Sequence, residues 1–365
     1  MVSPQYEFII IGAGIAGAAI AHELRGPGRS LSSGARKRDP MGRGDGDVLI
    51  VDSAPEIASG ASGNPKGIMR PFLSLGDDAM RRFYHAAWDY GLKVFEKLSV
   101  PVVQRGVLQF PKDEIETRFH TAPAFAGFDE DDLEYLSVTQ AADRLQIECR
   151  SDALFWPRAL VVDPAQWVRA LIGATLVKTQ ARIQKLEYQN HWHAITDQNE
   201  ILTAQNIIVT SGNYTGLLPP ETQTQIRPRA GQITMVPHDA LPVLSYAVSF
   251  GHYALPPQNL HESHIIGATY EHSNESPVTI AAHEKNIAAL KNLARALPIF
   301  AAAQNITPEI CTGRAAVRAT TANHMPLYGQ GAPHLYYLTG LGSRGLMSAP
   351  YAARQLMAIM DSGGR

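Results

Sequence analysis

The sequence predicts an α/β fold, and three observations lead to this expectation. Residues 8–11 form an apolar run that suits a strand buried on both faces. Three glycines with the spacing G-x-G-x-x-G follow, and an alanine-rich stretch of good helix formers comes after them. A second apolar run, at residues 48–51, ends in an acidic residue. Strand, glycine turn, helix and second strand together form a βαβ unit with parallel strands.

The composition is that of an ordinary globular protein, with 45% hydrophobic and 18% charged residues. A chain of 365 residues is long enough for one large or two modest domains. The formal net charge of -2 gives no overall attraction to polyanions. Net charge therefore does not by itself point to a nucleic-acid partner.

The sequence shows no pattern of a membrane or secreted protein. No apolar run approaches the ~20 residues that span a bilayer. The N-terminus passes almost at once into a strand, without the pattern of a signal peptide. We therefore expect a cytoplasmic protein in which Cys149 and Cys311 are reduced thiols. No cluster of metal-ligating residues has a suitable spacing, so we expect no metal site.

The glycine motif predicts a site for a dinucleotide. Gly12 permits the tight turn, Gly14 lets the backbone approach a pyrophosphate, and Gly17 lets the helix pack closely on the strand. Ile15 and Ala16 begin the helix, whose free N–H groups and positive dipole end favour phosphates. The unit is therefore expected to be of the Rossmann type.

The acid after the second strand is Asp52, which is expected to bind the ribose hydroxyls, with Ser53 beside it. The alternative is that Asp52 only starts a turn. This acid usually follows the glycines by about 20 residues, but residues 26–47 intervene and are rich in Gly, Ser and Arg. We expect a flexible surface insertion there, whose arginines are either solvated or in contact with a phosphate backbone.

A second glycine-rich loop, residues 59–67, favours a flavin over a nicotinamide. Small residues on a turn let backbone amides reach a ligand, and Ser62 and Asn64 can hydrogen-bond to it. The loop resembles the second FAD loop of the superfamily of D-amino-acid oxidase, glycine oxidase and sarcosine oxidase. By this resemblance its cofactor contacts are Ala61, Ser62, Gly63, Asn64, Lys66 and Gly67.

Three further segments resemble the same superfamily in the same order: residues 207–213, 229–232 and 336–350. A helix after the last of these would stabilise negative charge on a reduced flavin. The resemblance implies non-covalent FAD, because residues 59–67 contain no His and Cys311 does not match a flavin-linking cysteine. The cofactor contacts that it adds are Ser211, Gly212, Gly342, Ser343, Arg344, Gly345 and Leu346.

Within the superfamily, the motifs at residues 60–71, 313–326 and 341–350 resemble the oxidoreductase half of the bifunctional tRNA 5-methylaminomethyl-2-thiouridine biosynthesis proteins. Asn323 stands where that family usually has Asp, and Arg70 replaces an aromatic residue. Ser211 replaces a small apolar residue. Nothing in the sequence corresponds to the methyltransferase half, so a separate methyltransferase is a possible partner.

The resemblance implies a D-amino-acid-oxidase-like architecture: a Rossmann-type FAD-binding domain and a smaller α+β substrate domain with an antiparallel sheet. Its FAD-binding part would comprise residues 1–75, 150–225 and 305–365, and its substrate part residues 76–149 and 226–304. A helix is expected to start at Asp77-Asp78, because apolar residues recur at helical spacing between Met80 and Leu98. The acidic run at residues 129–132 is expected to be a solvated helix start.

Enzymes of this superfamily oxidise a C–N bond beside a carboxylate. Arg318 matches their substrate-carboxylate arginine, since a guanidinium grips a carboxylate through two parallel bonds. The alternative is an arginine in a structural ion pair. Tyr253 matches a tyrosine that helps to hold the substrate, although a phenol packed on a strand is the other interpretation. Arg344 would face the flavin or the substrate entrance.

The resemblance implies oxidation of the carboxymethylaminomethyl group of the tRNA wobble uridine. The products would be 5-aminomethyl-2-thiouridine and glyoxylate, with O2 as electron acceptor. A small-molecule amine or amino-acid oxidase acting on glycine, sarcosine or a D-amino acid is the alternative. A flavin-carrying subunit without turnover of its own is a third hypothesis.

Overall fold

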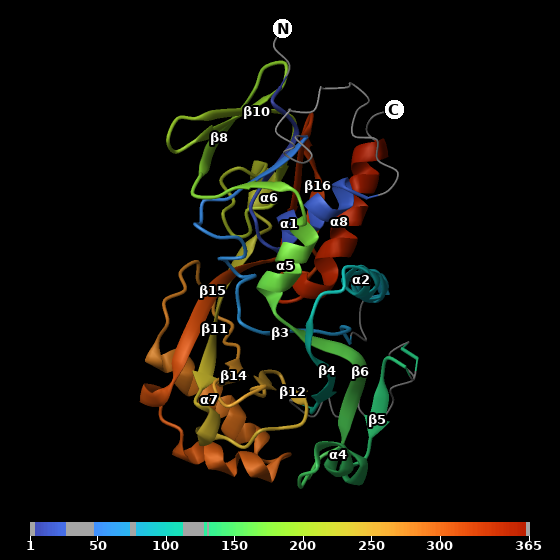
Figure 1. Ribbon diagram of the computed structural model, residues 1–365, viewed down its shortest axis with the longest axis vertical. Coiled ribbons are helices and arrows are strands. Elements are labelled where there is room, and N and C mark those ends of the chain that lie inside the picture. The colour runs from blue at the N-terminus through green and yellow to red at the C-terminus, as the bar shows by residue number, and fades with distance from the viewer. Residues whose placement is uncertain (1–3, 27–46, 74–77, 112–127, 130, 363–365) are drawn as a thin grey trace.

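A computed structural model describes residues 4–26, 47–73, 78–111, 128–129 and 131–362. Figure 1 shows two sheets, one in the upper half of the molecule with helices α1 and α8, the other in the lower half with helix α7. The insertion predicted at residues 26–47 lies almost wholly outside the described residues, since only Gly26 and Asp47 are described.

The upper sheet has eight strands in the order β16-β17-β10-β1-β2-β7, and the hairpin β8–β9 joins it beside β10. Strands β17, β10, β1, β2 and β7 run parallel, as the sequence predicted for β1 and β2. The apolar runs of β1, β2, β10 and β17 are buried on both faces, which is usual for parallel strands, while the edge strand β7 is only half-buried. The bounds are β1 (Tyr6–Ile11), β2 (Val48–Val51), β7 (Leu176–Lys178), β8 (Ile183–Tyr188), β9 (Trp192–Thr196), β10 (Ile201–Val209), β16 (Leu327–Ala332) and β17 (Leu335–Thr339).

Helices cover one face of the upper sheet. Helix α1 packs against α5 and α8, and α2 packs against α8, so these elements form one apolar core with the strands. Helix α2 begins at Asp78 as expected, and its predicted apolar stripe is buried at Phe83, Tyr84, Ala87 and Phe95. The bounds are α1 (Ile15–Leu24), α2 (Asp78–Lys97), α5 (Pro164–Ile172), α6 (Pro220–Gln223) and α8 (Gly345–Ser362).

The lower sheet has nine strands in the order β15-β11-β14-β13-β12-β4-β6-β3, with β5 paired to β6. All of its pairs are antiparallel except β12 with β4. Its strands are β3 (Gly67–Met69), β4 (Val102–Gln109), β5 (Glu134–Leu136), β6 (Ala153–Val162), β11 (Arg227–Val236), β12 (Ala247–Ser249), β13 (Tyr253–Leu255), β14 (His264–Gly267) and β15 (Thr312–Thr320). Helix α7 (Ile280–Leu293) packs against β11 and β14, while α4 (Val138–Leu145) packs against β5, and the short 3-10 helices are η2 (His238–Ala240), η3 (Pro298–Asn305) and η4 (Pro308–Ile310).

The predicted ranges of the two domains do not coincide with the change of sheet. Strands β3, β6 and β15 fall in ranges assigned to the FAD-binding part, yet all three belong to the lower sheet. The reason is hydrogen bonding: β6 pairs with both β3 and β4, and β15 pairs along most of β11. The division of the chain into a cofactor part and a substrate part stays our interpretation.

The acidic run at residues 129–132 differs from its prediction. Residues 131 and 132 form a turn and not a helix start, and the side chain of Asp132 is buried. Its carboxylate accepts a hydrogen bond from Trp88 Nε1 at 3.0 Å and lies 3.4 Å from the guanidinium of Arg158. Burial raises the pKa of Asp132. This acid is therefore an internal partner and not a solvated charge.

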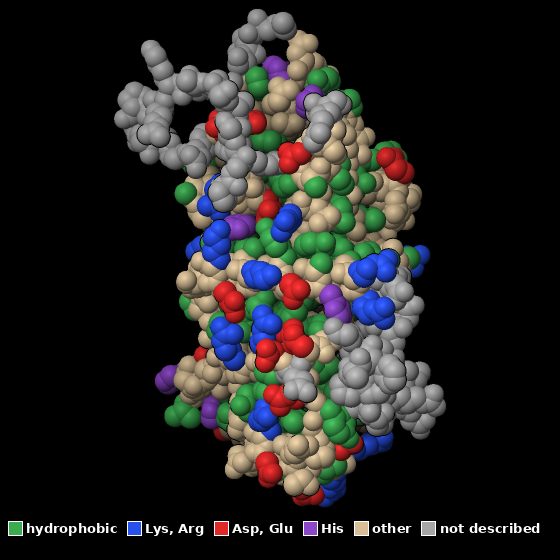
Figure 2. Space-filling view, turned by 90° about the vertical axis from the view of Figure 1, so that its right-hand side faces the viewer, with side chains coloured by type: hydrophobic (Ala, Val, Ile, Leu, Met, Phe, Trp, Pro, Cys, Tyr) green, Lys and Arg blue, Asp and Glu red, His purple; other side chains and the backbone are tan. Residues whose placement is uncertain are grey.

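Lys, Arg, Asp and Glu side chains are interspersed on the face shown in Figure 2, as the small net charge suggests. Among the helices in the described ranges, none is both long and apolar enough to cross a membrane.

Candidate active site

A cavity of about 1100 Å³ lies where the two sheets meet, and both sheets contribute to its lining. From the upper sheet come the residues that follow β1, β2, β10 and β17, which are parallel strands ending at the same edge. Ligands of open α/β sheets bind outside these carboxyl ends. From the lower sheet come residues of β4, β12, β13, β14 and β15.

The glycine turn after β1 is shaped by close backbone contacts. Gly12 has φ +117, and a Cβ added there would lie 2.6 Å from the carbonyl oxygen of Thr210. A Cβ added to Gly14 would lie 3.3 Å from Ser62 Oγ, at the wall of the cavity. Helix α1 begins at Ile15, and its N-cap Gly14 offers no side-chain acceptor. The helix therefore presents backbone N–H groups and its positive dipole end to the cavity, as a pyrophosphate requires.

Asp52 lines the cavity and also organises the turns around it. Its carboxylate accepts hydrogen bonds from the backbone N–H of Ala13 at 2.6 Å and of Ala54 at 2.8 Å. Ser53 lies next to it in the cavity wall. Both sequence interpretations thus have a structural basis, because Asp52 holds a turn and faces the space where a ribose would lie. The ribose contact stays a prediction.

The second glycine-rich loop is held from two directions. Ser62 Oγ accepts a hydrogen bond from the backbone N–H of Ile15 at 3.0 Å, which joins the loop to the start of α1. From the lower sheet, Arg314 of β15 donates to the carbonyl oxygens of Ser59 at 2.8 Å and Gly60 at 2.5 Å, and to Asn64 Oδ1 at 2.9 Å. The sequence placed Arg314 in a family motif but indicated no contact for it.

Most of the predicted cofactor residues line the cavity, and three do not. Gly17 lies against the backbone of Gly12, where it permits close packing of the helix, and Gly63 lies against Ala58 and Arg314. Lys66 is buried, and its ammonium forms an ion pair with Glu262. The lining set is Gly12, Gly14, Ile15, Ala16, Asp52, Ser53, Ala61, Ser62, Asn64, Gly67, Ser211, Gly212, Gly342, Ser343, Arg344, Gly345 and Leu346. Lys66 therefore links the loop to the lower sheet's loops rather than facing a cofactor.

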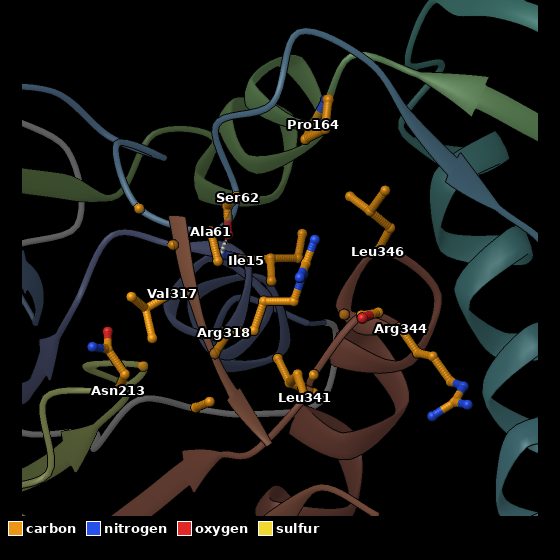
Figure 3. A pocket seen from close by; sticks show the side chains of 18 of the residues that line it. Ile15, Ala61, Ser62, Pro164, Asn213, Val317, Arg318, Leu341, Arg344 and Leu346 are labelled. Atoms are coloured by element: carbon orange, nitrogen blue, oxygen red, sulfur yellow. Dashed lines mark hydrogen bonds between the residues drawn. The ribbon is translucent and has the colours of Figure 1, made fainter. Parts of the chain in front are cut away.

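The last glycine loop leads into α8 at the cavity. Gly342 has φ +58, and α8 begins at Gly345, so the start of this helix also faces the cavity. The guanidinium carbon of Arg344 lies 3.7 Å from the ring centroid of Phe72 and 5.2 Å from that of Tyr84. Figure 3 shows this side chain turned toward α2, away from Arg318. The guanidinium of Arg344 thus packs against the rings of Phe72 and Tyr84 at one end of the cavity.

Arg318 of β15 is a half-buried cation in the wall of the cavity. Figure 3 shows its side chain reaching into the pocket beside Ile15. A Cβ added to Gly231 would overlap its guanidinium, so this glycine on β11 provides the space. Its Nη1 donates a hydrogen bond to the carbonyl oxygen of Thr269 at 3.4 Å, and no acidic side chain among the described residues pairs with it. Burial lowers the pKa of Arg318, since no carboxylate offsets the desolvation.

Tyr253 belongs to a row of residues that hydrogen-bonded strands bring into register. Gln109 of β4 is opposite Ser249 of β12, Ser249 is opposite Tyr253 of β13, and Tyr253 is opposite Gly267 of β14. All four line the cavity. Burial raises the pKa of Tyr253, and the nearby charge of Arg318 counteracts part of this rise. A neutral phenol beside a guanidinium can donate to an anion that the guanidinium holds.

No role was predicted from the sequence for several further lining residues, which the folded chain brings to the site. They are Gln109, Arg182, Thr210, Tyr214, Ser249, His252, Thr269, Tyr270 and His324. Among the described residues, four arginines line the cavity, at positions 70, 182, 318 and 344, against one acid, Asp52. The cavity is thus suited to anionic ligands although the whole chain has a net charge of -2.

Comparison with known proteins agrees with this geometry. Residues 7–359 match the model of the DAO family, described as FAD dependent oxidoreductase. The chain belongs to this family. The residues present fit FAD, since two helix starts, two glycine turns and an acid after β2 lie along one cavity. Neither Cys149 nor Cys311 lines that cavity, and the described residues contain no group of three metal-ligating side chains.

Individual relatives refine the comparison. The chain is 30% identical over 354 residues to the tRNA 5-methylaminomethyl-2-thiouridine biosynthesis bifunctional protein MnmC of Caulobacter vibrioides. The aligned region covers 96% of this chain and 53% of the relative. The chain thus spans about half the length of that relative. The glycine oxidase of Bacillus cereus has a similar fold, with a TM-score of 0.73 at 18% identity over 98% of this chain and 96% of the other. The iminodiacetate oxidase of Chelativorans sp. BNC1 also has a similar fold, with a TM-score of 0.72 at 19% identity over 97% of this chain and 95% of the other.

Proposed function

We propose that this protein oxidises a secondary amine that carries a carboxymethyl group, with FAD as its cofactor. The proposed substrate is 5-carboxymethylaminomethyl-2-thiouridine at the wobble position of tRNA, and the products are 5-aminomethyl-2-thiouridine and glyoxylate. The observation that carries this proposal is Arg318, a half-buried guanidinium without a carboxylate partner among the described residues, which reaches into the cavity. A charge that is largely removed from water needs a partner, and a substrate carboxylate supplies one.

Arg318 and Tyr253 would fix the substrate through its carboxylate. Two parallel N–H bonds from the guanidinium and one O–H bond from the phenol would orient the carbon between carboxylate and nitrogen toward the flavin. Bound FAD would accept two electrons and hydrogen from this carbon. Oxidation of the C–N bond leaves an imine, and water then splits it into the amine and glyoxylate.

The charges of the cavity also favour the reactive form of the amine. The amine must lose its proton before the carbon can be oxidised, because its nitrogen lone pair supplies the electrons of the new C=N bond. Arg70, Arg318 and Arg344 line the cavity, and nearby positive charge lowers the pKa of a bound ammonium group. No strong protein base is needed if the amine arrives neutral. These residues therefore act by orientation and electrostatics.

Two observations support a tRNA-borne substrate. The relative in Caulobacter vibrioides is named for tRNA 5-methylaminomethyl-2-thiouridine biosynthesis, and 96% of this chain aligns with it. The basic lining of the cavity also suits a ligand with several negative charges. A separate methyltransferase that acts on the product is part of this proposal, as is O2 as electron acceptor.

The second candidate function is oxidation of a free amino acid such as glycine or sarcosine. The balanced charge of the surface favours it, because Lys, Arg, Asp and Glu side chains alternate over the face in Figure 2. A third candidate is a flavin-carrying subunit without turnover of its own. All three candidates share the same cofactor and differ in what reduces it.

Anaerobic reduction of the bound flavin distinguishes these candidates. The FAD-loaded protein is mixed separately with glycine, with sarcosine and with tRNA that carries the carboxymethylaminomethyl group, and flavin absorbance near 450 nm and glyoxylate are followed. We expect the modified tRNA to bleach the flavin and release glyoxylate. Bleaching by glycine or sarcosine alone would establish the second candidate instead. No bleaching by any of them would support the third.

A further inference from the structure

Arg229 lies next to the substrate anchor and has no role in the site described above. It is on β11, and the strand register places it directly opposite Arg318 of β15. Opposed residues of an antiparallel pair project from the same face of the sheet. Gly231, two residues further along β11, is on this face too and provides the space for the guanidinium of Arg318. Two arginines are therefore neighbours on the cavity side of the sheet.

Tyr270 borders both arginines. The guanidinium carbon of Arg229 lies 5.6 Å from the centroid of its ring. The phenol is also close enough to Arg318 to act on its pKa, in the direction opposite to burial. Tyr270 lines the cavity while 46% of its surface stays exposed, so its ring stands at the cavity's opening. Arg318 lines the cavity and Arg229 does not, so we call Arg318 the inner cation and Arg229 the outer one.

The hydrogen-bonding capacity of Arg229 is largely unused. Its Nε is buried and has no partner, and its Nη1 donates to the carbonyl oxygen of Pro228 at 3.0 Å. No carboxylate of the described residues forms an ion pair with it. Buried N–H groups of a cation normally have acceptors, so this guanidinium points to an acceptor supplied by a ligand.

A second arginine, Arg344, adds positive charge near the opening of the cavity. His324 lines the cavity, and its pKa is lowered by burial and by the charges of Arg344 and Arg229. Both arginines therefore act on one site near the opening. An anion there would be attracted by Arg229 at one side and by Arg344 at the other.

We propose that Arg229 and Tyr270 form an outer subsite that binds the nucleotide carrying the substrate amine, with a phosphate at Arg229 and a base against the ring of Tyr270. This inference rests on the proposed function. A free amino acid that fills the space at Arg318 has no group to occupy this second position. The outer subsite would thus distinguish a nucleotide substrate from a small amine.

The aromatic ring decides between a phosphate and a second carboxylate. A guanidinium alone accepts either anion. An exposed ring next to a guanidinium matches the way proteins hold unstacked nucleotides, by base stacking together with phosphate contacts. A small amine with two carboxylates would use Arg229 but leave the ring of Tyr270 exposed.

The test compares substrates with and without phosphate in the FAD-loaded protein. The substrates are the nucleoside 5-carboxymethylaminomethyl-2-thiouridine and its 3′,5′-bisphosphate. In the wild-type protein we expect kcat/KM to be about tenfold higher for the bisphosphate, an advantage that shrinks as salt increases. Arg229→Gln should reduce the ratio of the two kcat/KM values to about one, and Arg229→Lys should leave an intermediate ratio. Arg295→Gln, at an exposed arginine beyond α7, is the matched control.

Tyr270 is tested with the same two substrates. Tyr270→Ala should lower kcat/KM for the nucleoside and for the bisphosphate alike by about tenfold, because both contain the base. Tyr270→Phe retains the ring and should retain most of the activity. FAD content and circular dichroism of each variant establish that it is folded.

Binding of uridine 3′,5′-bisphosphate, measured by calorimetry, supplies a readout without turnover. We expect Arg229→Gln to weaken this binding about tenfold, and equal binding by wild type and variant would overturn the subsite. If wild type releases glyoxylate neither from the two nucleoside forms nor from the modified tRNA, the proposed function fails, and the calorimetry still decides the subsite. If both forms react and Arg229→Gln leaves their ratio unchanged, the subsite fails while the proposed function stands. If Arg229→Gln lowers activity only toward a small amine with two carboxylates, Arg229 binds a carboxylate and not a phosphate.

Discussion

On the side of the upper sheet the cavity wall consists largely of backbone, whereas on the side of the lower sheet it consists of side chains. The upper wall has Gly12 and Gly14 after β1 and Gly342 before α8, together with two helix starts. The lower wall has Arg318, Tyr253 and their in-register neighbours. A backbone wall suits a cofactor whose phosphates accept N–H bonds, and a side-chain wall suits a substrate that must be selected. Substitutions on the two walls should therefore change different measurements.

The largest effect is expected at the side-chain wall. Arg318→Met should lower kcat/KM by about 10²- to 10³-fold, since loss of a buried charged partner costs roughly 2–5 kcal/mol. FAD content should stay close to that of wild type, because Arg318 belongs to the lower sheet. Steady-state glyoxylate release and flavin absorbance measure the two quantities. Arg295→Met is the control, and full activity in Arg318→Met would remove the anchor.

At the backbone wall we expect a smaller effect, and we expect it in the affinity for FAD and not in the selection of the substrate. Gly12→Ala places a methyl group 2.6 Å from the carbonyl oxygen of Thr210 at a φ of +117. A strained residue costs roughly 1–3 kcal/mol, so we expect FAD to bind up to about a hundredfold more weakly. Gly60→Ala is the matched control, because a Cβ there meets nothing within 4 Å. Titration of the apoprotein with FAD gives the affinities, and equal values for the two variants would contradict this account.

Arg314 connects the two walls, so its variants sharpen the comparison. Arg314→Met removes the hydrogen bonds to Ser59, Gly60 and Asn64 and should weaken FAD binding by about tenfold. Arg314→Lys retains the charge but not the planar fork, so it should recover only part of the affinity. FAD titration and the absorbance spectrum of the bound flavin measure the effect. Wild-type affinity in Arg314→Met would show that Ser62 alone holds the loop.

The smallest effect concerns pH and a buried histidine of α1. Burial, Arg25 and Lys97 lower the pKa of His22 to about 4. An unfolded histidine binds a proton below pH ~6.5, whereas the folded His22 stays neutral until the pH approaches 4. The free energy of unfolding is therefore higher above pH ~6.5, and it decreases as pH falls toward 4. We expect about 1 kcal/mol less stability at pH 5 than at pH 7, after allowance for partial solvent exposure. Urea unfolding of His22→Gln should show a smaller difference between these two pH values.

The two walls also differ in how far the sequence predicts them. Glycine spacing and strand-turn-helix order are local, so the sequence could single out Gly12, Asp52, the loop at residues 59–67 and Gly345, and most of these residues line the cavity. Their contacts with a cofactor stay a prediction. The lower wall depends on pairing between strands that are far apart in the sequence. Gln109 and Ser249 are opposite each other although 140 residues separate them, and no local pattern encodes such a register.

The same reason explains the residues whose role differed from the prediction. Lys66 lies in a loop that matches a cofactor motif, yet its partner Glu262 is 196 residues away. Asp132 lies in an acidic run, yet it is buried and accepts a hydrogen bond from the indole of Trp88. Arg314 was visible as part of a motif, but its three acceptors lie more than 200 residues earlier. Burial and long-range partners decided each of these cases.

Strand β15 carries Arg314 and Arg318, four residues apart, so both side chains project from the same face. One fastens the cofactor loop and the other reaches into the substrate space. Because the face alternates with every residue, a one-residue insertion between Arg314 and Arg318 would turn their guanidinium groups toward opposite sides of the sheet. A single codon gained there would separate the two functions that this strand brings together, while β15 could stay paired with β11. We therefore expect the length of this strand to be invariant among functional relatives, even where its apolar residues vary.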